Sequence, residues 1–259
     1  MEPISQELSQ VMQKMKRMKL PKEQGSYHCN ICKDEGFIYK SDGLYEVAIK
    51  CKCQALKEAK DRLNKSGLGD LLESKTLDNY KTNTDYQKHI KNIAIEYLNE
   101  YLKGNKYSLA LLGQSGVGKT HIMSAVSRKL LDEGVEVKYF IADDIIQRLQ
   151  ASKYDEQNYQ MEFGNIVKAE VLYIDDLFKS SITNYYKQEN IKIEDLKVIF
   201  EVINYRYNKK MPILLNSEIH FERFLDIDQA IIGRINEMCN YQYLVSIKPD
   251  VNKNYRLRR

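Results

Sequence analysis

The sequence lacks the features that would direct the chain into or across a membrane. It contains no run of about 18 apolar residues, the length that a membrane-spanning helix needs. Its first 20 residues mix Lys and Arg with apolar residues and contain no continuous hydrophobic core, so we expect no signal peptide. We therefore expect a protein of the reducing cytoplasm, without a membrane partner and without structural disulfides.

A strong charge of either sign is also missing. The 40 basic and 36 acidic residues leave a formal charge of +4, which permits contact with nucleic acid and does not require it. Low-complexity tracts and internal repeats are absent from the sequence. At 259 residues, the chain is long enough for one large domain, or for a small domain followed by a medium one.

The pattern of the first 70 residues predicts a small N-terminal domain. Apolar residues at steps of three and four between residues 4 and 18 indicate an amphipathic helix. This helix could pack on its own domain or dock on a partner. Residues 27–53 resemble a cysteine-rich hairpin, and a short helix over 54–65 ends at Ser66-Gly67-Leu68-Gly69. We place the domain boundary after this break, with domains at 1–70 and 76–259.

Strands and helices are expected to alternate in the second domain, which predicts an α/β fold with a parallel sheet covered by helices on both faces. The domain is long enough to bury a full core. We expect five strands, at residues 107–112, 135–141, 171–174, 213–215 and 241–247. We expect helices at residues 88–102, 119–131, 143–150 and 193–208.

A complete Walker A sequence joins the first of these strands to the next helix. Its glycines allow the backbone to turn its amides around phosphate groups, and the helix N-terminus adds partial positive charge. Lys119 is expected to reach the β- and γ-phosphates of ATP, and the Thr120 hydroxyl to bind Mg²⁺. The residues of this loop are Gly113, Gln114, Ser115, Gly116, Val117, Gly118, Lys119 and Thr120.

Two carboxylates follow the third expected strand, as in a Walker B sequence. We expect Asp175 to hold Mg²⁺, and Asp176 to orient or deprotonate the attacking water. Taken alone, a strand that ends in Asp-Asp could simply lead into a turn. The Walker A sequence upstream favours the catalytic interpretation.

Two further positions suggest that the site responds to its nucleotide. The strand 213–215 leads into Asn216 and Ser217, either of which could lie near the γ-phosphate. Arg234 interrupts an apolar, helix-like run. It is either a surface arginine or an arginine finger that reaches the ATP of a neighbouring subunit, and the second interpretation predicts self-association through the ATP site.

Four of the five cysteines have the spacing of a metal site. Cys29 and Cys32 form a knuckle, and Cys51 and Cys53 form a tighter pair. Four thiolates predict structural Zn²⁺, which would stabilise a domain with a poor core. An iron–sulfur cluster or free thiols are the alternatives, and His28 could replace one thiolate. Cys239 is expected to be buried.

Aromatic and basic residues alternate in two segments, which is typical of proteins that bind single-stranded nucleic acid. One segment is Tyr205-Arg206-Tyr207 with the two lysines that follow, and the other is the tail 253–259. Tyrosine is common throughout the chain, with 19 copies, so the pattern could instead reflect packing of the helix.

The order of these sequences resembles the bacterial and phage helicase loaders of the DnaC/DnaI type, a branch of the AAA+ ATPases with an IstB-like ATP-binding domain. The resemblance covers nearly the whole chain. It implies an AAA+ fold and an ATP-dependent protein that binds a DnaB-family replicative helicase and helps to place it on single-stranded DNA. By position, it implies Asn216 or Ser217 as sensor 1, Arg234 as the arginine finger and Arg256 as sensor 2, with Leu77 and Tyr80 beside adenine.

The resemblance also implies that the cysteine domain contacts the helicase. The shorter side chain of Asp176, where many AAA+ proteins have Glu, implies slow, switch-like hydrolysis. Two other classes of function compete with a loader: a transposition-helper ATPase and a P-loop kinase. The zinc ribbon favours the loader over the helper, and Arg234 argues against the kinase.

Overall fold

The computed structural model describes residues 27–41, 46–65, 74–180, 191–250 and 253–254. The chain divides into two compact units, Met1–Cys51 and Lys52–Arg259. The helix expected over residues 4–18, the break expected at Ser66 and the sensor 2 candidate Arg256 lie outside the described residues.

The first unit contains an antiparallel hairpin. Strand β1 (Phe37–Ser41) pairs with β2 (Glu46–Lys50) along its whole length. Among the described residues of this unit, Cys32 and Cys51 are the buried apolar side chains. The described residues alone bury too little apolar surface to offset the entropy of ordering the hairpin, so a bound metal would add to their stability.

The second unit is built on a five-stranded parallel sheet with the strand order β4-β5-β6-β3-β7. Strand β3 lies inside the sheet, whereas β4, the next strand along the chain, lies at the edge. The connections that leave the carboxyl ends of the neighbouring strands β3 and β6 therefore run in opposite directions. Ligands bind at such switch points, beyond the carboxyl ends of the strands. The strands are β3 (Leu109–Gly113), β4 (Val137–Ile141), β5 (Val171–Leu177), β6 (Ile213–Ser217) and β7 (Leu244–Ile247).

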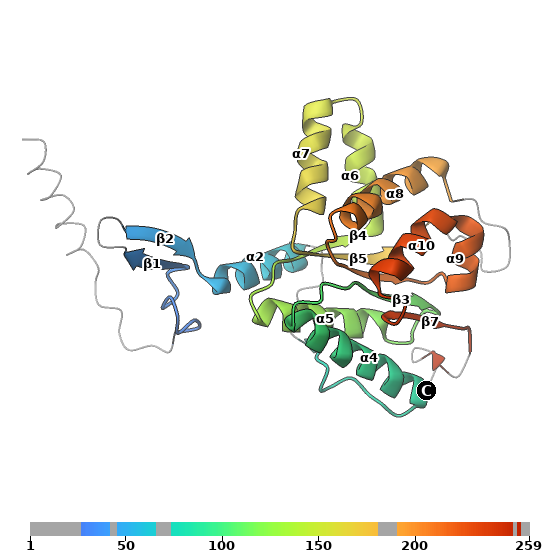
Figure 1. Ribbon diagram of the computed structural model, residues 1–259, viewed down its shortest axis with the longest axis horizontal. Coiled ribbons are helices and arrows are strands. Elements are labelled where there is room, and N and C mark those ends of the chain that lie inside the picture. The colour runs from blue at the N-terminus through green and yellow to red at the C-terminus, as the bar shows by residue number, and fades with distance from the viewer. Residues whose placement is uncertain (1–26, 42–45, 66–73, 181–190, 251–252, 255–259) are drawn as a thin grey trace, which may run out of the picture. The chain divides into compact units, whose positions relative to one another are not determined.

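Helices cover both faces of this sheet, which confirms the predicted α/β architecture. Figure 1 shows α4 and α5 on one face and α6, α8, α9 and α10 on the other. The first face carries α2 (Lys52–Lys65), α4 (Asp85–Leu102) and α5 (Lys119–Asp132). The second is associated with α6 (Ala142–Ser152), α7 (Glu156–Val167), α8 (Ile193–Asn208), α9 (Phe221–Ile227) and α10 (Gln229–Met238).

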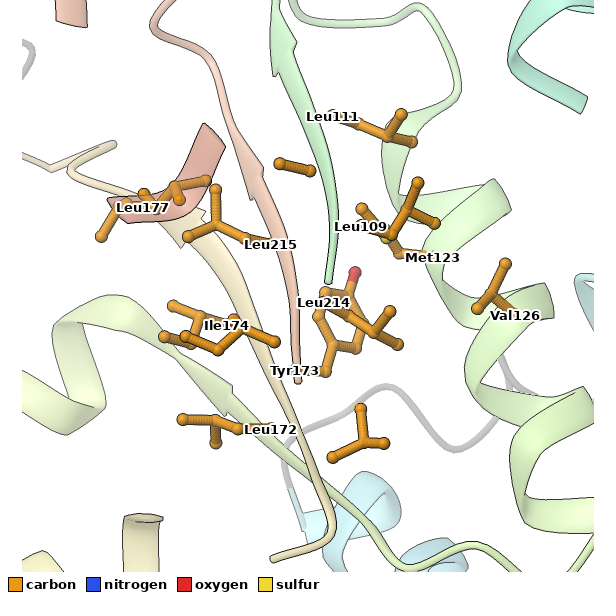
Figure 2. Packing of buried hydrophobic residues seen from close by; sticks show 14 of the residues in the cluster. Leu109, Leu111, Met123, Val126, Leu172, Tyr173, Ile174, Leu177, Leu214 and Leu215 are labelled. Carbon is orange, nitrogen blue, oxygen red and sulfur yellow. The ribbon is translucent and has the colours of Figure 1, made fainter. Parts of the chain in front are cut away.

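The core lies between the sheet and these helices. All five residues of β3 are buried, because a central parallel strand is covered on both faces and therefore consists of apolar residues. Figure 2 shows Leu109 and Leu111 beside Met123 and Val126 of α5. Cys239 is fully buried, as expected, and burial raises the pKa of its thiol.

The elements differ from the sequence-based expectations in several places. Helices α7 and α9 were not predicted, and β7 begins at Leu244 rather than at residue 241. Helix α2 packs against β4 and α5, so the second compact unit begins at Lys52 rather than after residue 70. Among the described residues, no helix combines the length and apolar character needed to cross a membrane.

Candidate functional site

The Walker A loop lies at the switch point and is shaped by its glycines. It runs from Gly113, the last residue of β3, to Lys119, the first residue of α5. Gly113, Gly116 and Gly118 have φ values of 103°, 76° and 95°, a region that side chains disfavour. A Cβ atom at Gly118 would also lie 2.8 Å from the Tyr80 ring. The loop conformation therefore depends on glycine.

Lys119 directs its amine into this loop. The side chain is buried, with a relative exposure of 6%, and Nζ donates hydrogen bonds to the carbonyls of Gly113 (2.7 Å) and Gln114 (2.8 Å). Burial lowers the pKa of Lys119 to about 8. Phosphate oxygens in the loop would favour the charged amine, because an opposite charge raises the pKa of a lysine.

A cleft of about 670 Å³ opens beside the loop. Lys119 and Thr120 line it together with Asp175, Asp176 and Tyr80. Leu77, Asn216 and Arg234 are not among the described residues that line it. The other lining residues are Lys75, Asn79, Lys81, Ser115, Gly116, Gly118, His121, Tyr139, Ile141, Lys179 and Glu218.

The two carboxylates at the end of β5 have different surroundings. Asp175 is 4% exposed and accepts a hydrogen bond from the Tyr139 hydroxyl at 3.1 Å. Burial, and then the neighbouring charge of Asp176, raise the pKa of Asp175. Asp176 is more exposed, and its Oδ2 lies 2.7 Å from Lys179 Nζ. A divalent cation would suit this cleft, because buried carboxylates and hydroxyls are hard oxygen ligands.

Asn216 and Ser217 hold β6 against the turn after β5. Asn216 accepts a hydrogen bond from the backbone N–H of Asp176 at 2.8 Å, and the Ser217 hydroxyl donates to the Leu177 carbonyl at 2.8 Å. Both side chains are fully buried. In this arrangement neither contacts the cleft directly, and the polar residue of this segment that lines the cleft is Glu218.

A capped turn closes the cleft on the other side. Thr76 and Asn79 bond reciprocally: each backbone N–H donates to the other's side-chain oxygen. His121 Nε2 lies 2.9 Å from the Thr76 carbonyl and meets Tyr80 edge-on. Leu77 is buried in the core beneath this turn. Spacing did not predict His121, because its role depends on a contact 45 residues away along the chain.

The final described segment also lies beside the Walker A loop. The backbone N–H of Asp250 donates to Gln114 Oε1 at 2.6 Å, and the Tyr86 hydroxyl donates to the Lys253 carbonyl at 3.0 Å. A Cβ atom at Gly116 would lie 2.0 Å from Asn254 Oδ1. Contacts from the C-terminal end of the chain thus help to fix the loop.

Arg234 lies away from the cleft, on α10. Its guanidinium is 4.8 Å from the centre of the Phe200 ring and 5.5 Å from that of Tyr207. It donates hydrogen bonds to Asn204 Oδ1 (3.0 Å) and to the Ala230 carbonyl (2.9 Å). The aromatic stack therefore holds the guanidinium in a defined position, away from the described residues that line the cleft.

The four cysteines of the N-terminal region form one cluster. The sulfur atoms of Cys29, Cys32, Cys51 and Cys53 all lie within 4.8 Å of one another, and those of Cys29 and Cys51 are 3.7 Å apart. Thiolates bonded at about 2.3 Å to one tetrahedral zinc would lie about 3.8 Å apart, so the cluster fits the ion. His28 does not belong to it, since its side chain is 99% exposed beside Asp34.

Local hydrogen bonds prepare this cluster for a metal. The Gly36 N–H points at Cys32 Sγ at 3.3 Å, and Asp34 Oδ1 accepts from the Cys29 N–H at 2.9 Å. The backbone amides of Cys32 and Ile31 lower the pKa of Cys29 to about 7. A lowered pKa favours the thiolate, the form that binds metal.

Arg206 corrects one interpretation of the sequence. Its side chain is fully buried and donates hydrogen bonds to the carbonyls of Val167, Ala169, Glu170 and Pro212. Tyr205 packs edge-on against Phe163 at 5.5 Å. Arg206 therefore cannot reach a phosphate, whereas Lys209 and Lys210, the two lysines of the same segment, are exposed. The tail 255–259 lies outside the described residues.

The P-loop, the acidic pair and the parallel five-stranded sheet define a P-loop nucleotide-binding protein. Residues 52–258 match the family of IstB-like ATP binding proteins, and the chain belongs to that family. The phage-like element PBSX protein XkdC of Bacillus subtilis (strain 168) is 34% identical over 229 residues, which are 86% of this chain and 83% of XkdC. YqaM of the same organism is 33% identical over 215 residues; the match covers 80% of this chain and 66% of the length of YqaM.

The expected resemblance to helicase loaders is confirmed. The replicative helicase loader DnaC of Escherichia coli (strain K12) is 24% identical over 179 residues, which are 68% of this chain and 69% of DnaC. A crystal structure of the DnaC helicase loader has a TM-score of 0.52 at 20% identity, and the match covers 69% of this chain and 98% of that one. This structural likeness shows a shared fold.

Proposed function

We propose that the protein is an ATP-dependent helicase loader, which binds a DnaB-family replicative helicase and helps to place it on single-stranded DNA. The proposal rests mainly on the relationship to DnaC, because the alignment with that loader covers 68% of this chain at 24% identity. The cleft beside the Walker A loop supplies an ATP site of suitable chemistry.

Several residues in and around the cleft have a part in this proposal. Lys119 and the loop amides bind the phosphates of ATP. Tyr80, which lines the cleft, and Leu77, which is buried in the core, contribute to the adenine pocket in this proposal. Thr120 and Asp175 would hold Mg²⁺, which neutralises charge that develops on the phosphates. Asp176 orients the water that attacks the γ-phosphorus, and Asn216 fixes the backbone of Asp176. The short Asp176 side chain makes hydrolysis slow.

Two further parts of the proposal reach beyond one chain. Arg234 acts as an arginine finger on a neighbouring subunit's ATP, so the loader self-associates through its nucleotide sites. The cysteine cluster binds structural Zn²⁺, and the domain that it stabilises contacts the helicase. In this proposal, ATP binding regulates how the protein binds its partner, and rapid turnover of ATP is not required.

The test is a binding experiment with the full chain and the replicative helicase of its host. We expect a complex on size-exclusion chromatography whose amount depends on ATP, and Lys119→Ala should remove that dependence. Lys129→Ala, on the exposed side of the same helix, is the matched control. Absence of a complex under every nucleotide condition would contradict the loader function.

The family includes proteins described as IstB-like, so a transposition helper is the second candidate. A complex with a transposase, in place of the helicase, would support that alternative. The P-loop kinase has no comparable support, because none of the relatives described above is a kinase.

A further inference from the structure

Lys179 is a charged residue of the cleft to which the roles above assign no function. It lies in the turn directly after β5, and its Nζ is 2.7 Å from Asp176 Oδ2 and 3.8 Å from Glu218 Oε1. All three side chains line the cleft with Lys119. The amine thus links the end of β5 to the residue that follows β6, on the side of the cleft where the acidic groups gather.

The backbone of this turn is held in an unusual conformation. Asp176 and Phe178 both have positive φ values, 54° and 60°, although neither is glycine. The Phe178 side chain is fully buried beside Phe224, and the Lys179 N–H donates to the Asp176 carbonyl. Strain of this kind persists where surrounding structure enforces it, and it often marks a functional position. The turn therefore fixes the Lys179 backbone while its long side chain can reach different partners.

Glu218 shows why a second cation is needed here. Among the charges around Lys119, that of Glu218 has the largest raising effect on the pKa of its amine. The Glu218 carboxylate lines the same cleft as the amine that would bind the β- and γ-phosphates. Asp175 and Asp176 line it too, so a γ-phosphate would meet three carboxylates there, and a further cation beside it would offset their repulsion.

We propose that Lys179 detects the third phosphate of ATP: its amine exchanges Asp176 and Glu218 for a γ-phosphate oxygen, which leaves Asp176 available to orient water. This inference rests on the proposed nucleotide site. The exchange is feasible because the Lys179 side chain is 46% exposed, and partly exposed ion pairs are weak and rearrange easily. ADP lacks the oxygen that would replace the carboxylates, so the amine would stay where it is.

The exchange makes Lys179 a positioning residue that separates the triphosphate state from the diphosphate state. Without nucleotide, it neutralises two carboxylates and keeps Asp176 occupied. With ATP, it compensates for the charge of the γ-phosphate. Its removal should therefore weaken ATP binding and leave ADP binding almost unchanged, which a residue that merely supports the fold would not do.

The experiment measures equilibrium binding of Mg²⁺–ADP and of a non-hydrolysable Mg²⁺–ATP analogue to the full chain. For Lys179→Met, we expect affinity for the ATP analogue to fall about tenfold, with less than a twofold change for ADP. Lys179→Arg should restore most of the discrimination, because it keeps the charge. Glu218→Gln should shift the ratio of the two affinities toward ATP, because it removes a charge that repels the γ-phosphate.

Lys81→Met is the matched control, since Lys81 is another lysine that lines the same cleft, and no ion pair with Asp176 or Glu218 is found for it among the described residues. It should change both affinities by the same factor. Equal losses for ATP and ADP in Lys179→Met, or no change in either, would overturn the role of Lys179 alone. A wild-type chain that binds neither nucleotide would overturn the ATP site itself, and binding of the helicase is scored separately.

Discussion

Two glycines with nearly the same backbone conformation have very different surroundings. Gly113 has φ +103° and Gly104 has φ +104°. A Cβ atom at Gly113 would lie 2.0 Å from the Ile247 carbonyl oxygen, whereas one at Gly104 would meet nothing within 4 Å. Comparing alanine at the two positions therefore separates the cost of the conformation from the cost of the contact.

We expect Gly104→Ala to lower the free energy of unfolding by about 1 kcal/mol, the cost of positive φ alone. Gly113→Ala should lower it by at least about 3 kcal/mol, because backbone atoms of β3 and β7 must also separate. Urea denaturation monitored by circular dichroism measures both changes in the free energy of unfolding. Equal losses would show that the sheet yields to the extra atom without cost.

The charge of Lys119 depends on what occupies the Walker A loop. Its amine is held by two carbonyls and its pKa is lowered to about 8 by burial, so an anion in the loop would raise that pKa again. We expect Lys119→Ala to weaken ATP binding by about 100-fold or more, because a buried charge-assisted contact is lost. Isothermal titration with ATP tests this, and zinc content should remain as in the wild type.

At the scale of elements, Arg206 joins the segment before β5 to the start of β6. Its guanidinium donates to four carbonyls, and burial lowers its pKa to about 10. Arg206→Met should destabilise the fold by about 3–5 kcal/mol, since it leaves buried carbonyls without donors. Arg128→Met, which removes an exposed pair with Asp132, should cost less than about 1 kcal/mol. Chemical denaturation of the two variants makes the comparison.

The cysteine cluster gives a prediction about metal binding. We expect about one Zn²⁺ per chain by elemental analysis, and loss of the metal in Cys32→Ser, because a buried thiolate ligand is removed. Cys239→Ala should keep the metal, since Cys239 is buried in the core and is not one of the four clustered cysteines. Visible absorption and bound iron in the purified protein would instead indicate an iron–sulfur cluster.

The sequence predicted the elements best where one physical rule dominates. Helix α8 begins and ends where expected, at Ile193 and Asn208, because its apolar period is regular. The buried strand β3 was found because apolar runs mark central parallel strands. Helix α7 was missed because three of its twelve residues are buried, which is too few for a clear apolar stripe.

The site was predicted in part for a similar reason. Lys119, Thr120, Asp175 and Asp176 belong to contiguous sequence patterns, and all four line the cleft. Contacts between distant segments left no such pattern: Tyr139 meets Asp175, and Lys179 approaches Glu218, only because β4, β5 and β6 lie side by side. A side chain's partner across a sheet depends on strand order, which local patterns do not specify.

At the scale of the whole molecule, the position of Arg234 decides how many chains make one active site. The guanidinium stacks on Phe200 and Tyr207, away from the residues that line its own cleft. If it completes a neighbour's site, the contact between subunits must be heterologous, with the cleft of one chain facing α10 of the next. A single chain would then bind ATP and hydrolyse it poorly.

We expect Arg234→Ala to lower the rate of ATP hydrolysis by about 10³-fold or more while leaving ATP affinity within about twofold. Mixing supplies the decisive measurement. Arg234→Ala chains keep an intact Walker A loop, and Lys119→Ala chains keep the arginine. In a mixed assembly, a complete site therefore forms where the cleft of an Arg234→Ala chain faces the Arg234 side chain of a Lys119→Ala chain. In an equal mixture about a quarter of the sites would be complete, and activity should recover in proportion.

Each variant alone should stay inactive, because neither can form a complete site. Recovery on mixing would require Arg234 to act between chains, since no single chain in the mixture has both residues. A loss of ATP affinity in Arg234→Ala, together with no recovery on mixing, would instead assign the arginine to the packing of α10 against α8, where Phe200, Asn204 and Tyr207 already hold it.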